Sequence, residues 1–332
     1  MNENYRKVSE PGDQIDHKID AVLPWQGMEL PGTIPQGDMP GDKIEIGPEH
    51  RKKADVIFPI LLEQLREVWQ KNPYRRAVVA VCGGSGVGKS EIASLLSYYL
   101  NQAGIGSYTL SGDNYPHRIP KYNDAERLHV FRESGVRGMV EGSVYTDERF
   151  RLLKEWQAAE DDANPAHQKE HPWFSEYLNA GRKGLESYLG TDREINFSEV
   201  SQIVSAFKDG ADKIWLKRMG REETELWYEE VDFSHIHTLV IEWTHGNSDF
   251  YQGVDFPVLL NSTPQETLAH RRARNRDGRT DSPFTTLVLQ IEQNLLRSQA
   301  PKAKLILSKG GEVLSYEAYC QLMAESEVAG NE

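Results

Sequence analysis

The stretch from Ala77 to Ser90 constrains the fold of this chain more than any other. A short apolar run, Ala-Val-Val-Ala-Val-Cys, leads into Gly-x-x-x-x-Gly-Lys-Ser at residues 83–90, and a helical pattern follows. This order is typical of a P-loop, in which a strand, a glycine-rich loop and a helix together bind phosphate. An ordinary glycine-rich turn between a strand and a helix is the alternative, but it does not require the complete motif. The stretch therefore predicts a phosphate site.

The residue types of the loop suit this chemistry. Glycine takes backbone dihedrals that other residues avoid, so the N–H groups of the loop can close around phosphate oxygens. The helix that begins near Lys89 points the positive end of its dipole at the same anion. Lys89 is expected to reach the outer phosphates, and the Ser90 hydroxyl a magnesium ion. The expected nucleotide-binding residues here are Gly83, Gly84, Ser85, Gly86, Val87, Gly88, Lys89 and Ser90.

Length and charge limit the class of protein. The 332 residues suffice for one large or two ordinary domains, and the net charge is -13, from 51 acidic and 38 basic residues. This balance argues against a nucleic-acid partner, which a basic face would bind. Only two cysteines occur, no apolar run is long enough to span a bilayer, and the N-terminus lacks a signal pattern. We therefore expect a cytoplasmic protein without a membrane partner.

Periodicity and turn residues predict an α/β fold. The expectation is a three-layer P-loop sandwich with a mostly parallel five-stranded sheet, an inserted helical lobe and a β-hairpin. The expected segments are an irregular N-terminal arm at 1–48, the first part of the core at 49–118, the helical lobe at 119–192 and the rest of the core at 193–332. Strands are expected at 77–82, 107–111, 238–242, 256–260 and 305–307.

Two acids follow or end predicted parallel strands. Asp113 comes just after strand 107–111, and Glu242 ends strand 238–242. Because ligands bind at the carboxyl ends of parallel strands, both are expected near the P-loop. Asp113 has the alternative of being a common turn residue. A buried Glu242 would be costly without a cation or donors, which favours a link to magnesium.

Further polar residues are candidates for substrate binding. Tyr115, His117 and Arg118 follow Asp113 closely, and His245 lies just beyond Glu242. Two short alternating runs, at 213–219 and 224–228, predict a hairpin with Lys217 and Arg218 on its first strand. These two cations suit an anionic substrate, although a solvated strand face explains them equally well.

Arginines are dense between Arg271 and Arg279, which is informative in an acidic chain. Arginine forks suit phosphates, and cations beside a transferring phosphoryl group stabilise the charge that develops there. We expect Arg272 and Arg276 to serve catalysis and Arg274 to bind nucleotide. The alternative is a solvated helix end.

Together these parts resemble the uridine kinase and phosphoribulokinase group of P-loop kinases, over about residues 75–125 and 193–315. The resemblance rests on the segments Gly83–Ser90, Ser111–Tyr115, Val240–Glu242, Arg271–Arg279 and Leu305–Gly311. It implies that Asp113 is the base that takes the proton of a substrate hydroxyl. It also implies that Ser90, Asp113 and Glu242 hold Mg²⁺, while Lys89 and the arginines between Arg271 and Arg279, as part of a lid, neutralise the phosphoryl group of ATP.

The chain departs from this group in three places. The strand-three acid is usually followed by glycine, whereas Glu242 is followed by Trp243-Thr-His-Gly, and the arm and the inserted lobe are additions. These departures put the identity of the phosphoryl acceptor in question more than the type of reaction. The expectation is an ATP-dependent kinase that phosphorylates a hydroxyl of a small metabolite of the nucleoside, sugar or sugar-phosphate class.

Two alternatives stay open at this stage. A nucleotide-hydrolysing switch or assembly protein would act on a protein partner, and a kinase with a larger acceptor would use the extra lobe to cover it. The sequence also leaves open the choice between ATP and GTP. It does not fix the oligomeric state, of which a homodimer is one option.

Overall fold

The computed structural model describes residues 13–263, 266–267 and 282–329. The chain forms two compact units. The first comprises Met1–Tyr115, Phe197–Thr263 and Leu296–Glu332, and the second comprises Pro116–Asn196 and Pro264–Leu295. The second unit contains the segment expected as an inserted lobe, and it also includes residues that follow the fourth predicted strand.

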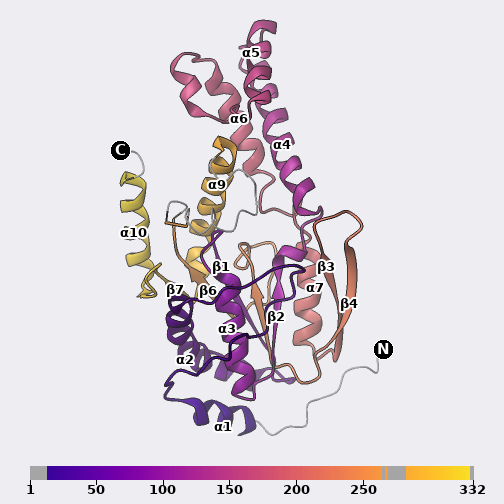
Figure 1. Cartoon of the computed structure of the whole chain (residues 1–332), viewed down its shortest axis with the longest axis vertical. Coiled ribbons are helices and arrows are strands. Elements are labelled where there is room, and N and C mark those ends of the chain that lie inside the picture. The colour runs from indigo at the N-terminus through magenta and orange to yellow at the C-terminus, as the bar shows by residue number, and fades with distance from the viewer. Residues whose placement is uncertain (1–12, 264–265, 268–281, 330–332) are drawn as a thin grey trace. The chain divides into compact units, whose positions relative to one another are not determined.

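A mostly parallel sheet forms the centre of the first unit (Figure 1). Its strands are β1 (Ala77–Gly83), β2 (Ser107–Ser111), β5 (Thr238–Glu242), β6 (Phe256–Leu260), β7 (Leu305–Leu307) and β8 (Val313–Leu314). Their order is β2-β5-β1-β6-β7-β8, and all neighbours are parallel except β7 and β8. The predicted fold class is confirmed. The expectation of five strands was one short, because a turn at Gly311, with a φ of 87°, returns the chain as β8.

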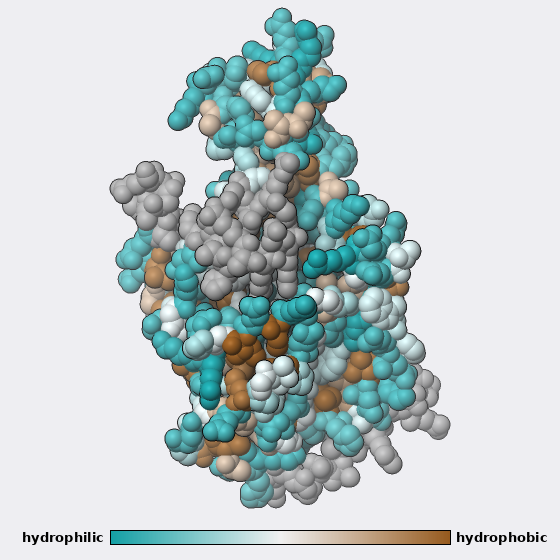
Figure 2. All heavy atoms as spheres, viewed as in Figure 1, coloured by the Kyte–Doolittle hydropathy of each residue, from teal (hydrophilic) through white to brown (hydrophobic). Residues whose placement is uncertain are grey.

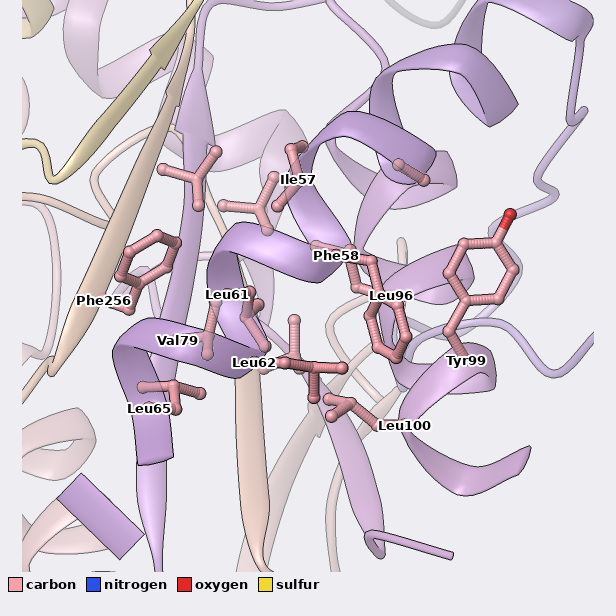
Figure 3. Close-up of a cluster of buried hydrophobic side chains, with 14 of the residues drawn as sticks. Ile57, Phe58, Leu61, Leu62, Leu65, Val79, Leu96, Tyr99, Leu100 and Phe256 are labelled. Carbon is pink, nitrogen blue, oxygen red and sulfur yellow. The ribbon is translucent and has the colours of Figure 1, made fainter. Parts of the chain in front are cut away.

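Helices cover both faces of this sheet. They are α1 (Asp13–Val22), α2 (Pro48–Lys71), α3 (Lys89–Gln102), α7 (Phe197–Lys208) and α10 (Tyr316–Ala329). Successive side chains of a strand point to opposite faces, so Val79 and Val81 join the cluster of α2 and α3, while Cys82 joins that of α10. Figure 3 shows the first cluster, where Val79 lies among side chains of α2 and α3.

The N-terminal segment is more ordered than expected. Ile15 and Ile19 lie one helical turn apart and are buried, so α1 forms where an irregular arm was predicted. Beyond α1, the ring of Trp25 packs against Phe58 and Tyr99 at centroid distances of 4.5 and 4.9 Å. The segment is therefore docked on α2 and α3.

Arg76 joins the start of β1 to the C-terminal end of α7. Its guanidinium is buried and donates hydrogen bonds to the carbonyl oxygens of Phe207, Ala211 and Phe233, each at 2.8 Å. Carbonyls at the end of a helix carry partial negative charge and suit a buried cation. Burial nevertheless lowers the pKa of Arg76.

The predicted hairpin is present as a separate two-stranded sheet. It consists of β3 (Lys213–Met219) and β4 (Leu226–Asp232), in register from Lys213 opposite Asp232 to Met219 opposite Leu226. Its second strand begins two residues later than expected and is longer. Arg218 lies opposite Trp227 in this register, so the two side chains share one face of the hairpin.

The second unit is helical. It contains α4 (Pro120–Glu141), α5 (Asp147–Ala158), the short 3₁₀ helix η2 (Pro165–Lys169), α6 (Phe174–Glu186) and the first part of α9 (Pro283–Gln299). Glycines let α4 and α6 approach closely, since a Cβ at Gly138 would lie 2.1 Å from that of Ala180. A buried Asp162 accepts two hydrogen bonds from Arg132, at 2.8 and 2.9 Å, and one from the Tyr177 hydroxyl at 2.7 Å.

The two cysteines differ in environment, which gives a first prediction. Cys82 is fully buried in β1, and burial raises the pKa of its thiol to about 12, whereas Cys320 is partly exposed. Because the thiolate is the reactive form, a disulfide reagent should modify one thiol per folded chain and two after unfolding. A Cys82→Ala variant should keep the native reactivity. Fast modification of two thiols in the folded wild type would contradict the burial of Cys82.

The surface that Figure 2 shows is mainly hydrophilic, with apolar residues in small groups. This agrees with the large number of charged residues in the chain. Within the described residues, no helix combines the length and the apolar character needed to cross a membrane.

Candidate functional site

The predicted P-loop connects β1 to α3. Gly86 and Gly88 have φ angles of 78° and 93°, in the left-handed region that favours glycine. A Cβ at Gly83 would lie 2.5 Å from the carbonyl oxygen of Leu260, so the loop can pass this strand only with a glycine. These constraints give physical reasons for glycine at three of the four predicted positions.

Lys89 lies at the first turn of α3. Its Nζ donates a hydrogen bond of 3.0 Å to the carbonyl oxygen of Gly84, and its side chain is half-buried. The ammonium is thus held over the loop whose N–H groups are expected to bind phosphate. A lysine in this position supplies a positive charge close to where the negatively charged outer phosphates of a nucleotide would lie.

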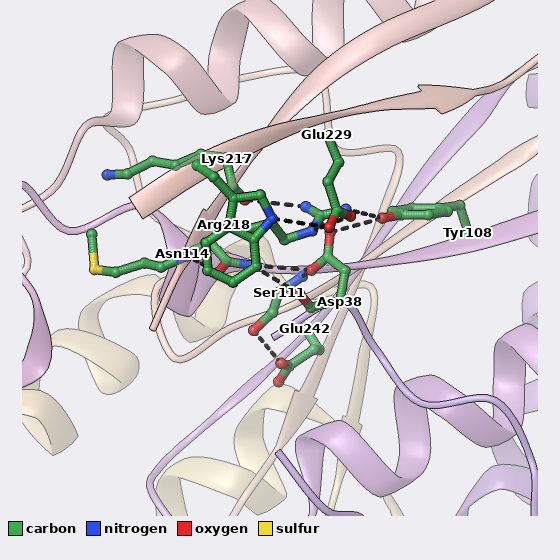
Figure 4. Close-up of polar contacts among 10 residues, drawn as sticks. Asp38, Tyr108, Ser111, Asn114, Lys217, Arg218, Glu229 and Glu242 are labelled. Atoms are coloured by element: carbon green, nitrogen blue, oxygen red, sulfur yellow. Dashed lines mark hydrogen bonds and ion pairs between the residues drawn. The ribbon is translucent and has the colours of Figure 1, made fainter. Parts of the chain in front are cut away.

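The register of the sheet brings three strand ends together. Glu242 is the direct neighbour of Val81 on one side and of Ser111 on the other. The Ser90 hydroxyl donates to Glu242 Oε2 at 3.1 Å, and the Ser111 hydroxyl donates to Glu242 Oε1 at 2.5 Å. Figure 4 shows the Ser111 and Glu242 side chains pointing toward each other. Glu242 therefore meets the P-loop serine at the carboxyl edge of the sheet.

The electrostatics around Glu242 favour a cation. Burial, and next the charge of Asp113, raise the pKa of Glu242 to about 8, while the Ser111 hydroxyl and Lys89 act against this rise. A buried carboxylate is stabilised by a bound cation, and hydroxyl and carboxylate oxygens are ligands that Mg²⁺ prefers. Within the described residues, no cluster of three or more His, Cys, Asp or Glu could hold a metal unaided. The Ser90 hydroxyl and the Glu242 carboxylate could serve as two ligands of an ion whose other ligands are phosphates and water.

Asp113 lies in the turn after β2. This turn is a single 3₁₀ segment, η1 (Gly112–Asn114), and the Asp113 side chain is exposed while Gly112 and Asn114 are buried. The charge of Asp113 reaches Glu242, since it raises the pKa of that carboxyl. An exposed carboxylate beside the metal candidate, on a turn with buried neighbours, is accessible to an incoming hydroxyl.

The packing of Trp243 explains why a bulky residue, and not glycine, follows Glu242 in this chain. A Cβ at Gly112 would lie 2.0 Å from Cγ of the Trp243 ring, so the indole packs directly on the glycine of the Asp113 turn. His245 is also buried here, with its ring edge-on to Trp243 at 5.6 Å. The bulky residue and the glycine thus fit as a pair.

This packing gives a second prediction. Gly112→Ala should lower the melting temperature by several degrees, because overpacking a closed contact costs about 1–3 kcal/mol. Thermal unfolding of Gly32→Ala serves as the control, since a Cβ at Gly32 would meet nothing within 4 Å. Equal melting temperatures for the two variants would contradict the contact with Trp243.

The structure places the other predicted residues differently. Tyr115 is fully buried, and Lys217 and Arg218 are 5% and 4% exposed, so the alternative of a solvated strand face does not hold for these two cations. His117 and Arg118 belong to the second unit, where they contact the Asp192 carbonyl oxygen and the Tyr188 hydroxyl. The substrate roles of these residues stay predictions. Arg272, Arg274 and Arg276 lie outside the described residues.

Sequence reasoning missed three residues near the site. The Ser111 hydroxyl binds Glu242, although strand serines carry no special signal. The His50 ring, from the first turn of α2, lies against the P-loop, 2.8 Å from a Cβ built at Gly88. Asp38, from the N-terminal segment, accepts a hydrogen bond from the backbone N–H of Ser111. The last two are distant in sequence from the motif, and no local pattern points to them.

A cleft of about 600 Å³ lies beside Asp38. Its walls come from residues 35–41, the second half of α3, β2 and the hairpin. It includes none of residues 83–90 and not Asp113, so it is separate from the phosphate loop.

Comparison with known proteins adds one sequence relative. The chain is 39% identical over 253 residues to the bifunctional alpha-galactosidase/sucrose kinase of Mediterraneibacter gnavus. The match covers 76% of this chain and 22% of the relative, so the chain spans about a fifth of the length of this curated relative. The chain is thus similar to part of a protein whose name includes a kinase activity, which agrees with the predicted resemblance to P-loop kinases. No protein-family model matches the chain.

Three solved structures are similar at low identity. A putative fructose transport system kinase from Silicibacter sp. TM1040 has a TM-score of 0.38 and 15% identity, and covers 71% of this chain and 92% of its own. A possible uridine kinase from Bacillus stearothermophilus has a TM-score of 0.36 and 15% identity, and the match covers 74% of this chain and 98% of that one. D-glycerate 3-kinase from Cryptococcus neoformans has a TM-score of 0.43 and 11% identity, and the match covers 79% of this chain and 97% of that one.

The strand, loop and helix from β1 to α3, and the parallel sheet beside them, decide the fold class. The chain has a P-loop α/β fold. With the helices on both faces of the sheet, the three-layer arrangement expected from the sequence is present.

Proposed function

We propose that this protein is an ATP-dependent kinase that transfers the γ-phosphoryl group to a hydroxyl of a small metabolite. The observation that carries this proposal is the meeting of Ser90, Glu242 and Ser111 at one sheet edge, with Asp113 exposed on the next turn. A nucleotide switch needs the P-loop and the metal site, but it has no use for a base that faces an acceptor alcohol.

Each residue has a role in this proposal. The backbone N–H groups of residues 83–90 bind the phosphates, and Lys89 neutralises the charge of the transferring group. Asp113 accepts the proton of the attacking hydroxyl. Ser90 and Glu242, with Asp113 nearby, would hold Mg²⁺, which would help to neutralise negative charge on the phosphates. Catalysis then depends mainly on positioning and charge.

The name of the relative indicates which acceptors to test first. It combines two activities, and of these only the kinase requires a nucleotide site, which the motif of residues 83–90 predicts. We therefore propose the sugar class, with sucrose as the first candidate. Use of ATP and Mg²⁺, a location in the cytoplasm, the absence of nucleic-acid and membrane partners, and a homodimer all stay predictions.

The test is ADP release from ATP and Mg²⁺ across a panel of acceptors. The panel contains sucrose, other di- and monosaccharides, sugar phosphates, nucleosides and glycerate, and the Lys89→Ala protein is the control. We expect sucrose or a related sugar to stimulate ADP release in the wild type alone. Stimulation by nucleosides only would overturn the sugar class, and tight ATP binding without any acceptor effect would favour the switch.

A further inference from the structure

Asp38 is a buried carboxylate that the N-terminal segment brings to the catalytic edge of the sheet. Its side chain is 7% exposed and lies beside β2 and β3 (Figure 4). Oδ1 accepts hydrogen bonds from the Ser111 backbone N–H at 2.7 Å and from Asn114 Nδ2 at 3.2 Å. Oδ2 accepts from the Tyr108 hydroxyl at 3.0 Å and from Arg218 at 2.9 Å. These four hydrogen bonds thus come from groups on β2, the η1 turn and β3.

Two of these donors flank Asp113. Ser111 precedes it by two positions and Asn114 follows it directly, so one carboxylate oxygen fixes both ends of the turn that carries the proposed base. Ser111 also donates its hydroxyl to Glu242. The Asn114 side chain in turn accepts from the Met219 backbone N–H at 3.0 Å, which ties the turn to β3. Asp38 is therefore linked to Glu242 through Ser111, and to Asp113 through the turn residues Ser111 and Asn114.

The other side of Asp38 holds its countercharge. Arg218 donates to Asp38, to the Tyr108 hydroxyl at 2.8 Å and to Glu229 at 3.1 Å, and it is buried. Burial raises the pKa of Asp38 to about 6, while the charge of Arg218 lowers it. Placing a charged pair inside a protein has a desolvation cost, which a simple apolar contact would avoid. Trp25 already docks the N-terminal segment in that cheaper way.

We propose that Asp38 is a positioning residue that holds Asp113 in the geometry required for phosphoryl transfer. This inference rests on the proposed function, in which Asp113 is the base. The N-terminal segment then completes the active site instead of merely covering α3. A purely structural role, in which Asp38 only attaches the segment, is the competing explanation.

The chain offers a matched control for this test. Asp162 in the second unit is also a buried carboxylate that accepts from one arginine and one tyrosine hydroxyl. Asp38→Asn should lower kcat about 10- to 100-fold, the scale of a misplaced catalytic group, with KM for ATP within about twofold of wild type. Asp162→Asn should lower the melting temperature while kcat stays within about twofold. A kcat loss in Asp38→Asn no greater than in Asp162→Asn would overturn the proposal.

A double variant separates positioning from general weakening. If Asp38 acts through Asp113, adding Asp38→Asn to Asp113→Asn should leave the turnover of the single Asp113 variant nearly unchanged. Independent effects would instead multiply, and that result would also reject the proposal. Should Asp38→Asn fail to fold, Tyr108→Phe removes one of the donors to Asp38, together with one acceptor of Arg218, and should lower kcat about threefold by the same route. An unchanged kcat in that variant would count against the proposal.

Hydrogen exchange gives a measurement that does not depend on kinase activity. The Ser111 backbone N–H donates to Asp38, so exchange of residues 111–115 should be at least about tenfold faster in folded Asp38→Ala than in wild type, and unchanged in Asp162→Ala. Unchanged exchange in Asp38→Ala would overturn the positioning role even if the protein is a kinase. A wild type that no acceptor stimulates would overturn the proposed function, while faster exchange would still support the hold on the turn.

Discussion

Lys89→Ala is expected to lower acceptor-stimulated turnover at least about a hundredfold, a loss of about 2.7 kcal/mol in transition-state stabilisation. Within the described part of the chain, the lysine side chain donates one hydrogen bond, to the Gly84 carbonyl oxygen, and it is half-buried, so the fold should lose little. The charge that it supplies to a transferring phosphoryl group has no substitute among the described residues of the loop itself. Steady-state ADP release and calorimetric ATP binding measure the two effects separately.

A matched lysine elsewhere controls for the loss of a cation. Lys208 donates to the Gly253 carbonyl oxygen at 3.3 Å and to Asp255, at the amino end of β6 and thus at the edge of the sheet opposite the site. Lys208→Ala should cost stability but leave kcat within about twofold. If Lys89→Ala retains more than a tenth of wild-type turnover, the P-loop does not serve phosphoryl transfer in the proposed way.

Asp113→Asn is expected to lower kcat at least about a hundredfold, because an amide cannot accept the proton of the attacking hydroxyl. Asp113 is exposed, so its replacement by an isosteric amide should leave the melting temperature near that of the wild type. Affinity for ATP should change little, since the phosphates are expected to contact residues 83–90 instead. Rapid-quench measurement of the first turnover locates the loss in the chemical step.

Asp232 provides the control for this substitution. It is an exposed aspartate at the end of β4 that accepts from the Ser234 backbone N–H at 2.8 Å. Asp232→Asn should keep wild-type kcat. Near-normal turnover in folded Asp113→Asn would exclude Asp113 as the base.

Patterns among consecutive residues were sufficient to predict the main elements of the sheet and the phosphate loop. The P-loop, the parallel strands and the hairpin were predicted because each has a signal within a short stretch of sequence. These signals are a continuous apolar run, the alternation of apolar and polar residues, and turn residues. Glu242 and Asp113 were both predicted to lie near the P-loop because the carboxyl ends of parallel strands share an edge, and the charge of Asp113 does raise the pKa of Glu242. The short β8 was missed because two residues carry too little pattern.

Long-range contacts were beyond this reasoning. Arg218 was recognised as a hairpin cation, but nothing in β3 indicates that its partner would be Asp38, 180 positions away. The proline- and glycine-rich segment before α2 was predicted as irregular, and its turns gave no sign that one acid would be buried. Trp243 was seen only as a departure, because its fit onto Gly112 joins residues that are adjacent in space and distant along the chain.

The separation of Asp38 from its partners has a consequence for how the protein is made. During synthesis Asp38 leaves the ribosome first, Ser111 follows about seventy residues later and Arg218 only after 180. Closing so long a loop has an entropy cost that few contacts can offset until the hairpin has formed. We therefore expect the β2 turn to acquire its final order late in folding, only after the hairpin has formed.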